Sequence, residues 1–202
     1  MKLALIKYNA GNIQSVTYAL NRLGVEPILT DNVDEILSAD KVIFPGVGEA
    51  STAMHFLKSA GLDKVIPALK QPTLGICLGL QLMCKHSEEN NTDCLGVFDI
   101  NVKRFQEYPN GFEAERFKVP EMGWNSIQNL KSPLFKGINE NSFVYFVHSF
   151  YAELSDFTIA ETTYANKFSA ALHKDNFYAA QFHPEKSGDI GSAIIKNFIE
   201  LC

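Results

Sequence analysis

A cysteine placed between two glycines gives the clearest chemical signal in this sequence. Cys77 has a glycine two residues before it and another two residues after it, in the segment GICLGLQ at residues 75–81. An apolar run changes there into a helical pattern, which is the form of a nucleophile elbow. Unpaired N–H groups at the start of a helix favour a thiolate. The pattern predicts a nucleophilic cysteine; the alternative is a buried cysteine beside glycines that let a strand pack on a helix.

A second segment supplies a base for this nucleophile. His183 and Glu185 flank Pro184 in the segment QFHPE at residues 181–185. In an extended segment, side chains two residues apart point to the same face, and proline restricts the backbone to such a conformation. Glu185 would then hold the His183 ring so that its other nitrogen takes a proton from Cys77. A surface histidine and glutamate at a turn are the alternative, which the elbow cysteine disfavours.

Acyl transfer also needs N–H donors for the negatively charged oxygen of its intermediate. The N–H of Leu78, directly after the nucleophile, is one candidate. The N–H of Val47 is the other, because residues 45–48 (PGVG) form a second turn from a strand to a helix. Glycine on both sides of Val47 lets its peptide rotate at little steric cost. An ordinary turn remains the alternative there.

Elements of a parallel sheet would position these segments. Short apolar runs alternate with helical patterns through the first 90 residues, which is typical of β-α-β units. Asn12 is expected to cap the first helix at its start and Gly24 at its end. We expect strands over residues 2–7, 26–30, 41–44 and 73–77, and further helices from Glu49 and after Cys77.

The second half of the chain has a different pattern. We expect strands over residues 143–147, 157–163, 168–173 and 177–182, and then a last helix over 190–201. No helical pattern separates these strands, so a mixed sheet or an antiparallel extension is predicted. Residues 105–118 are polar and include Pro109, Asn110 and Gly111, which predicts an exposed loop. Residues 1–202 are expected to form one α/β domain with a mixed, mainly parallel central sheet flanked by helices.

The composition argues against several functional classes. The chain has 202 residues, and 18 Lys and Arg against 23 Asp and Glu give a net charge of −5. It lacks the basic clusters typical of proteins that bind nucleic acid or membrane surfaces. No apolar run approaches the ~18 residues of a membrane helix, and residues 3–6 are too few for a signal-peptide core. A cytoplasmic protein is expected.

No metal or cofactor is expected either. The four cysteines form no C-x-x-C pair, which argues against zinc, redox work or a disulfide framework. Cys84, Cys94 and Cys202 are interpreted as core or surface filler. Residues 8–12 lack the Gly-x-Gly-x-x-Gly pattern that binds dinucleotides.

The segments around Cys77, Val47 and His183 resemble, in order and separation, the signature blocks of triad-type, class I glutamine amidotransferases. Further blocks are similar to the glutaminase subunits of imidazole glycerol phosphate synthase: AGN (10–12), SEE (87–89), PEMGWN (120–125), YFVHSF (145–150) and EKSG (185–188). The resemblance covers residues 2–201. It implies a flavodoxin-like fold and hydrolysis of glutamine to glutamate and ammonia through a thioester on Cys77.

The resemblance further implies a heterodimer with a (β/α)₈-barrel cyclase subunit, which combines the ammonia with a phosphorylated ribulosyl nucleotide in histidine biosynthesis. Gln81 lies one helical turn beyond Cys77, and a carboxylate such as Glu89 can pair with the substrate's α-ammonium group. The residues that match family positions around the bound glutamine are Gly48, Gln81, Glu89, Ser149 and Phe150.

Three residues match positions that the family places toward the cyclase: Asn12, Trp124 and Lys186. Trp124 is equally well interpreted as a core anchor, and Lys186 as a solvated charge. Lys7 and Asn9 depart from the family pattern beside the partner-facing loop.

Two other functions remain open at this stage. A paralogous glutaminase subunit would deliver the ammonia to another acceptor, such as a sugar nucleotide. A non-catalytic binding module on the same kind of sheet is the other possibility. It predicts the loss of at least one triad position, whereas Cys77, His183 and Glu185 are all present.

Overall fold

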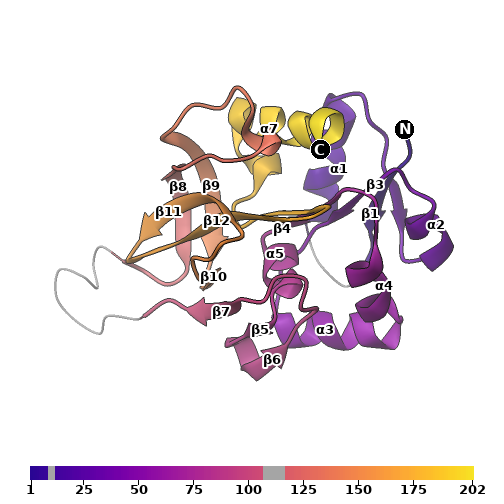
Figure 1. Ribbon diagram of the computed structural model, residues 1–202, viewed down its shortest axis with the longest axis horizontal. Coiled ribbons are helices and arrows are strands. Elements are labelled where there is room, and N and C mark those ends of the chain that lie inside the picture. Colours follow the sequence, from indigo (N-terminus) through magenta and orange to yellow (C-terminus); the bar gives the residue numbers. More distant parts are fainter. Residues whose placement is uncertain (9–11, 107–116) are drawn as a thin grey trace.

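The computed structural model describes residues 1–8, 12–106 and 117–202, which form three layers (Figure 1). The middle layer is a seven-stranded sheet with the order β11-β12-β13-β4-β3-β1-β2. Neighbouring strands from β2 to β13 run parallel, whereas β12 and β11 are antiparallel additions. The predicted mixed, mainly parallel sheet with flanking helices is confirmed.

The large sheet draws strands from both halves of the chain. All residues of β1, β4 and β13 are buried, as expected for parallel strands covered on both faces. The predicted strands lie within two residues of the observed ends. The observed strands are β1 (Leu3–Ile6), β2 (Ile28–Thr30), β3 (Lys41–Phe44), β4 (Thr73–Ile76), β11 (Thr158–Tyr164), β12 (Asn166–Lys174) and β13 (Phe177–Ala180).

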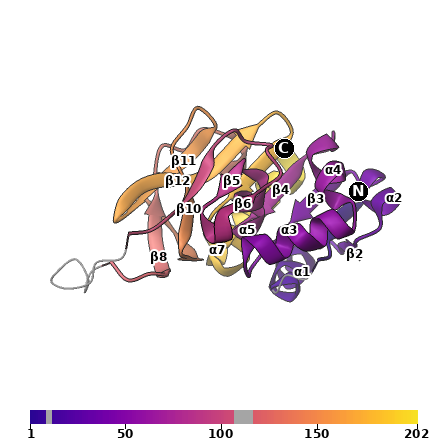
Figure 2. The same cartoon turned by 90° about the horizontal axis from the view of Figure 1, so that it is seen from below.

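Helices cover the two faces of the sheet (Figures 1 and 2). One apolar cluster packs α3, α4 and α5 on one face, through residues such as Leu57 and Leu80, and a second packs α1 and α7 on the other, through Leu20 and Phe198. The sequence did not predict α2 and α4. The helices are α1 (Ile13–Arg22), α2 (Val33–Leu37), α3 (Ala50–Ser59), α4 (Leu62–Ala68), α5 (Leu78–Met83) and α7 (Gly188–Leu201).

Two smaller sheets complete the fold. A hairpin of β8 (Glu121–Ile127) and β9 (Ser142–His148) packs on the side of α7. A four-stranded sheet lies on the side of α5. Its strands, in spatial order, are β10 (Phe150–Ala152), β7 (Asn101–Arg104), β5 (His86–Ser87) and β6 (Thr92–Asp93). The short 3₁₀ turns are η1 (Glu89–Asn91), η2 (Pro133–Phe135) and η3 (Pro184–Lys186).

Two local predictions are wrong. Asn12 stands at the start of α1, but its side chain makes no capping hydrogen bond, because the amide is turned toward Glu185. The segment 105–118 is not exposed throughout: Phe105 is buried, and its ring centroid lies 4.6 Å from that of Tyr151. Residues 107–116 of that predicted loop, and residues 9–11 near the N-terminus, lie outside the described residues.

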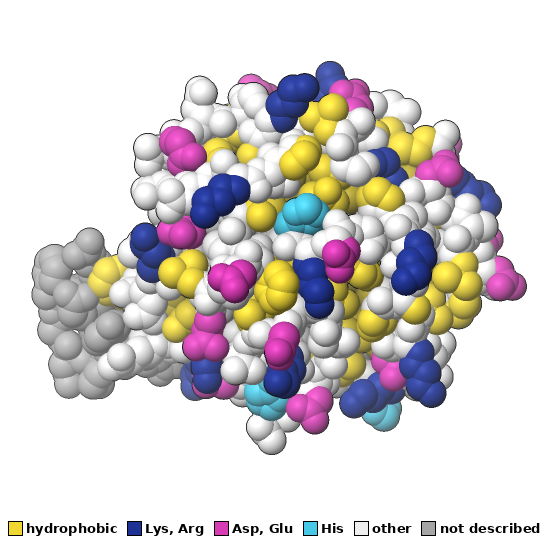
Figure 3. Space-filling model, viewed as in Figure 1, with side chains coloured by type: hydrophobic (Ala, Val, Ile, Leu, Met, Phe, Trp, Pro, Cys, Tyr) yellow, Lys and Arg dark blue, Asp and Glu magenta, His cyan; other side chains and the backbone are white. Residues whose placement is uncertain are grey.

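Within the described part of the chain, none of the helices has the length and apolar character needed to cross a membrane. Acidic and basic side chains are interspersed on the face shown in Figure 3. That face carries no large field of one sign, which agrees with the modest net charge of −5.

Candidate active site

Cys77 occupies a strained turn between β4 and α5. Its backbone has φ 53° and ψ −107°, a conformation that residues with a side chain seldom adopt. Its N–H donates to the Ala180 carbonyl of β13 over 2.7 Å, and its carbonyl accepts from the Gln81 N–H over 3.2 Å. Hydrogen bonds to the sheet on one side and to the helix on the other therefore hold the elbow in place.

The glycines around Cys77 allow α5 to approach the sheet closely. A Cβ atom on Gly79 would collide with the Phe44 carbonyl oxygen of β3. One on Gly75 would lie 2.9 Å from the Met83 sulfur. The positive φ is at the cysteine itself. The two glycines thus allow the helix to pack closely on the sheet, whereas the strained backbone conformation of the turn is at Cys77.

His183 and Glu185 contact each other as the sequence suggests, but for a different backbone reason. His183 Nδ1 lies 2.7 Å from Glu185 Oε1, and neither side chain is exposed. Pro184 does not continue an extended segment; it begins the 3₁₀ turn η3, which is closed by a hydrogen bond from the Lys186 N–H to the His183 carbonyl. The Asn12 amide donates to the same Glu185 oxygen over 2.5 Å. The turn and this third side chain orient the pair.

The charge state of His183 depends on its neighbours. Burial by itself lowers the pKa of His183, but Cys77 and Glu185 act in the opposite direction and raise it to about 10. Nε2 is buried and makes no hydrogen bond of ordinary geometry within the described residues. Since Nδ1 is directed at Glu185, Nε2 is the nitrogen left for Cys77. A ring that keeps its proton beside a cysteine favours a thiolate–imidazolium pair.

This raised pKa makes stability depend on pH. A histidine with an unfolded pKa near 6.5 and a folded pKa near 10 stabilises the fold fully below about pH 6.5, and this contribution is lost as the pH rises to about 10. Between pH 7 and pH 10 we therefore expect the free energy of unfolding to fall more for the wild type than for His183→Asn. Urea unfolding at both pH values measures the difference. An equal fall in the two proteins would contradict the assignment.

The two expected oxyanion donors are not presented together. The Leu78 N–H donates to the Gly46 carbonyl over 3.2 Å, so it is already engaged. The C=O and N–H of one trans peptide point in opposite directions, so the Val47 N–H is directed away from Leu78. Rotation of the Gly46–Val47 peptide would free the Leu78 N–H from the Gly46 carbonyl. It would also turn the Val47 N–H toward the side that the Leu78 N–H faces. A side chain at Gly46 would collide with the buried Tyr8 hydroxyl.

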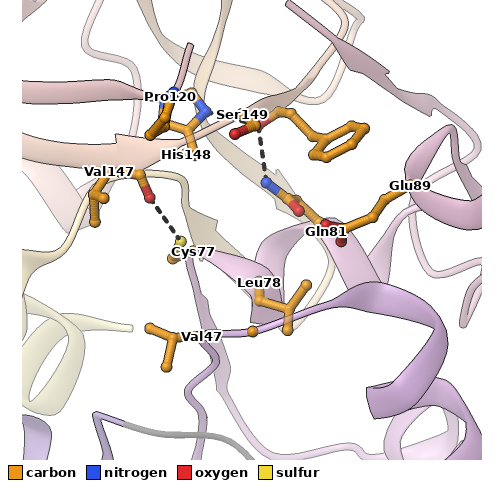
Figure 4. A pocket seen from close by; sticks show the side chains of 11 residues that line it. Val47, Cys77, Leu78, Gln81, Glu89, Pro120, Val147, His148 and Ser149 are labelled. Carbon is orange, nitrogen blue, oxygen red and sulfur yellow. Dashed lines mark hydrogen bonds between the residues drawn. The ribbon is translucent and has the colours of Figure 1, made fainter.

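A cavity of about 340 Å³ opens beside Cys77 (Figure 4). All five residues that the sequence suggests for glutamine binding line it. Glu89 is half-buried, and this burial raises the pKa of its carboxyl group. The Ala50 N–H, which donates to Oε2 over 2.7 Å, acts in the opposite direction and lowers the pKa. The lining residues are Val47, Gly48, Cys77, Leu78, Gln81, Glu89, Pro120, Val147, His148, Ser149 and Phe150.

The three residues suggested for the partner surface have different environments. Trp124 is 56% exposed, which excludes the alternative of a core anchor. Lys186 is also exposed. Asn12 is only partly buried, but its amide contacts Glu185. Its observed contact is therefore with the candidate triad.

The structure adds polar residues that the sequence did not single out. Glu121 and His148 form a buried pair, with 3.0 Å between Oε2 and Nε2, at the edge of the cavity. Gln181 is buried beside Cys77, and the buried Tyr8 hydroxyl has no partner in the described part of the chain. Glu121, His148 and Gln181 lie in segments that are recognisable in the sequence, but the contacts that give each residue its role form only on folding. Over the described residues, no group of three His, Cys, Asp or Glu side chains is placed to hold a metal ion.

Comparison with known proteins identifies the family. Residues 4–201 match the family described as glutamine amidotransferase class-I. The chain belongs to this family. Among relatives of this amidotransferase, the "Imidazole glycerol phosphate synthase subunit HisH" of Bacteroides fragilis is 64% identical over 201 residues, covering 100% of both chains. The protein of the same name from Bacteroides thetaiotaomicron is 61% identical with the same coverage.

Solved structures support the fold of this amidotransferase. A glutamine amidotransferase from Thermotoga maritima superposes with a TM-score of 0.63. The match covers 99% of this chain and 81% of that one, at 18% identity. A second solved glutamine amidotransferase gives a TM-score of 0.73, also at 18% identity, and covers 98% of this chain and 97% of that one. At that identity the likeness concerns the fold alone.

Proposed function

We propose that this chain is the glutaminase subunit of an imidazole glycerol phosphate synthase, which hydrolyses glutamine and passes the ammonia to a cyclase subunit in histidine biosynthesis. The full-length identity of 64% to a protein of that name carries the proposal. Cys77 lines the cavity, and the buried pair of His183 and Glu185 that acts on Cys77 lies behind it, which supports the proposal. Delivery of ammonia to a sugar nucleotide has no comparable support, and an intact triad argues against a mere binding module. We take residues 1–202 as one glutaminase domain. We also propose that the enzyme is cytoplasmic.

In the first half-reaction, the Cys77 thiolate attacks the side-chain carbonyl carbon of glutamine. The electron pair of the C=O bond moves to oxygen, and the tetrahedral intermediate forms. As it collapses, the C–N bond breaks and the His183 imidazolium gives its proton to the leaving nitrogen, which departs as ammonia. Glu185 holds the ring during this transfer. The product is a thioester between Cys77 and the glutamyl group.

In the second half-reaction, neutral His183 takes a proton from a water molecule that attacks the thioester carbonyl. The C–S bond then breaks, and Cys77 leaves as a thiolate while His183 remains protonated. The new carboxylic acid loses the remaining proton of the water to solvent and is released as glutamate, and the starting charge state of Cys77 and His183 is restored. Glutamine and water are thus converted to glutamate and ammonia with no external cofactor.

Both tetrahedral intermediates need N–H groups that donate to the oxyanion. In the present geometry the N–H groups of Leu78 and Val47 are not free to do so together. The Gly46 carbonyl occupies the Leu78 N–H. We infer that the Gly46–Val47 peptide rotates in the active complex, so that the N–H groups of Val47 and Leu78 both face the oxyanion. One such donor contributes about 10²–10³-fold to the rate. Hydrolysis by the isolated chain should therefore be slow.

The exposed side of the β8–β9 hairpin is proposed as the cyclase-facing surface of the heterodimer. Met122, Trp124 and Phe143 expose 66%, 56% and 57% of their surface there, which is unusual for large apolar side chains in a free monomer. Strand β9 connects this surface to the active site, because the His183 N–H donates to the Tyr145 carbonyl over 2.9 Å. Lys186, in the same turn as Glu185, lies next to this connection and is proposed as a second contact.

Labelling with a glutamine-like electrophile tests the proposal. The reagent binds in the glutamine cavity and alkylates the nucleophile, so mass spectrometry of the peptides should find the label on Cys77 alone. Excess glutamine should slow the labelling. Modification of Cys84, Cys94 or Cys202 with Cys77 untouched would refute the assignment.

A further inference from the structure

Gln181 is a buried amide in direct contact with the nucleophile. It follows β13, has no exposed surface, and its Nε2 lies 3.7 Å from the sulfur of Cys77. Its Oε1 accepts a hydrogen bond from Nε2 of Gln81 over 3.1 Å. Both ends of the side chain are therefore engaged, one by the nucleophile and the other by a residue of the glutamine cavity.

A backbone carbonyl determines which end of Gln181 faces the sulfur. The Phe150 carbonyl can only accept hydrogen bonds, so Gln81 must present its amino group there, 2.9 Å away (Figure 4). The second hydrogen of that amino group points at Gln181, which must then present its oxygen. The NH₂ group of Gln181 is consequently the end that faces Cys77.

The Phe150 carbonyl, which determines the orientation of both glutamine side chains, is itself held in place by a hydrogen bond. His148 Nδ1 lies 2.6 Å from the Phe150 oxygen and donates to it. Nε2 of the same ring lies 3.0 Å from the buried Glu121 carboxylate. The Phe150 carbonyl is thus held by a buried histidine whose ring also contacts a carboxylate. Reversal of either amide would leave two donors or two acceptors facing each other.

We propose that Gln181 is a hydrogen-bond donor that stabilises the thiolate of Cys77, and that Gln81 is the positioning residue that orients it. This inference rests on the proposed glutaminase function, in which the thiolate is the attacking group. The Val147 carbonyl, 3.9 Å from the sulfur, accepts from a thiol but repels a thiolate. Gln181 has the opposite preference, since an N–H donor binds an anionic sulfur more strongly than a neutral one.

The ionisable groups that face Cys77 are His183, from the turn after β13, and Tyr8, which follows β1. His183 supplies a positive charge, and the buried Tyr8 phenol stays neutral because burial and Cys77 raise its pKa. Gln181 adds a neutral donor whose strength does not change with pH. Removal of Gln181 should therefore shift the pH dependence of Cys77 reactivity along the pH axis without changing the shape of the curve.

Alkylation by iodoacetamide tests the inference, because the reagent reacts with thiolates and needs no glutamine site. The rate constant at Cys77 is measured from about pH 5 to about pH 10 by peptide mass spectrometry. Gln181→Met keeps the length of the side chain and removes its donor. We expect the half-maximal pH to rise by about one unit, so the rate falls by about tenfold at pH values below both midpoints and is unchanged on the high-pH plateau. Gln81→Met should shift the profile in the same direction by less.

Gln71→Met is the matched control. The Gln71 amide also donates to a backbone carbonyl, that of Ile36 over 2.8 Å, but it lies before β4, away from the cavity. This variant removes a comparable hydrogen bond and should leave the alkylation profile unchanged. Thermal unfolding of all variants reports the stability cost separately.

An unchanged pH profile in Gln181→Met would overturn the inference, and so would a loss of rate that is equal at every pH. If Gln181→Met does not fold, Gln81→Met decides by the same criterion. The proposed function fails separately: a wild-type Cys77 that resists the glutamine-like electrophile would refute the glutaminase, whatever Gln181 does to iodoacetamide alkylation.

Discussion

Replacement of Cys77 by alanine should abolish glutamine-dependent synthesis by the assembled enzyme while leaving synthesis from a high concentration of ammonium salt largely intact. Removal of the attacking sulfur eliminates the thioester route, so glutamine hydrolysis should fall by at least about 10⁴-fold. The proposed cyclase subunit carries out the acceptor chemistry, which needs only ammonia. Steady-state rates with each nitrogen source measure both effects.

Cys84→Ala provides a matched control for this experiment. Cys84 is also buried, directly follows α5, and donates its thiol proton to the Leu80 carbonyl over 3.4 Å. Burial raises the pKa of Cys84 well above its ordinary value, which keeps it an unreactive thiol. Its replacement should leave both activities in place. If Cys77→Ala destroys both activities together, Cys77 is structural or the acceptor chemistry belongs to this chain.

Glu185→Gln should lower kcat for glutamine hydrolysis by about 10²–10⁴-fold with little change in KM. The substitution keeps the shape of the side chain but removes the negative charge that His183 Nδ1 faces at 2.7 Å. The imidazolium is then less stable and the ring can turn away from Cys77. The residue does not line the cavity, so substrate affinity should be preserved. Initial rates over a range of glutamine concentrations separate the two parameters.

Glu121→Gln distinguishes this effect from the general cost of altering a buried carboxylate. Glu121 is paired with His148 at 3.0 Å and is also shielded from solvent. Within the described contacts it reaches Cys77 only through the Phe150 carbonyl, Gln81 and Gln181, so Glu121→Gln should lower kcat by no more than about tenfold. Both variants should lose stability to a similar extent in urea unfolding. A kcat for Glu121→Gln as low as that for Glu185→Gln would show that the loss reflects disruption of the cavity and not loss of the triad.

Local sequence determined the parts of this protein whose geometry depends on neighbours along the chain. The apolar runs of β1, β3 and β4 were predicted within two residues, because burial on both faces requires continuous apolar strands. Cys77 was recognised as an elbow because the flanking glycines permit a close approach of helix and sheet. The two-residue spacing of His183 and Glu185 brought them together even though the backbone forms a 3₁₀ turn there.

Tertiary structure decided what depends on residues far apart in the chain. Asn12 has the sequence position of a helix cap, but its NH₂ group donates to the carboxylate of Glu185, 173 positions away, and its side chain makes no hydrogen bond to the helix N–H groups. The Leu78 N–H is engaged by the Gly46 carbonyl because α5 and the turn after β3 meet at one sheet edge. Trp124 is exposed because no layer formed by the described residues covers its face of the β8–β9 hairpin. Gln181 is directed at Cys77 by Gln81 and Phe150, and no pattern within one segment records such a chain of hydrogen bonds.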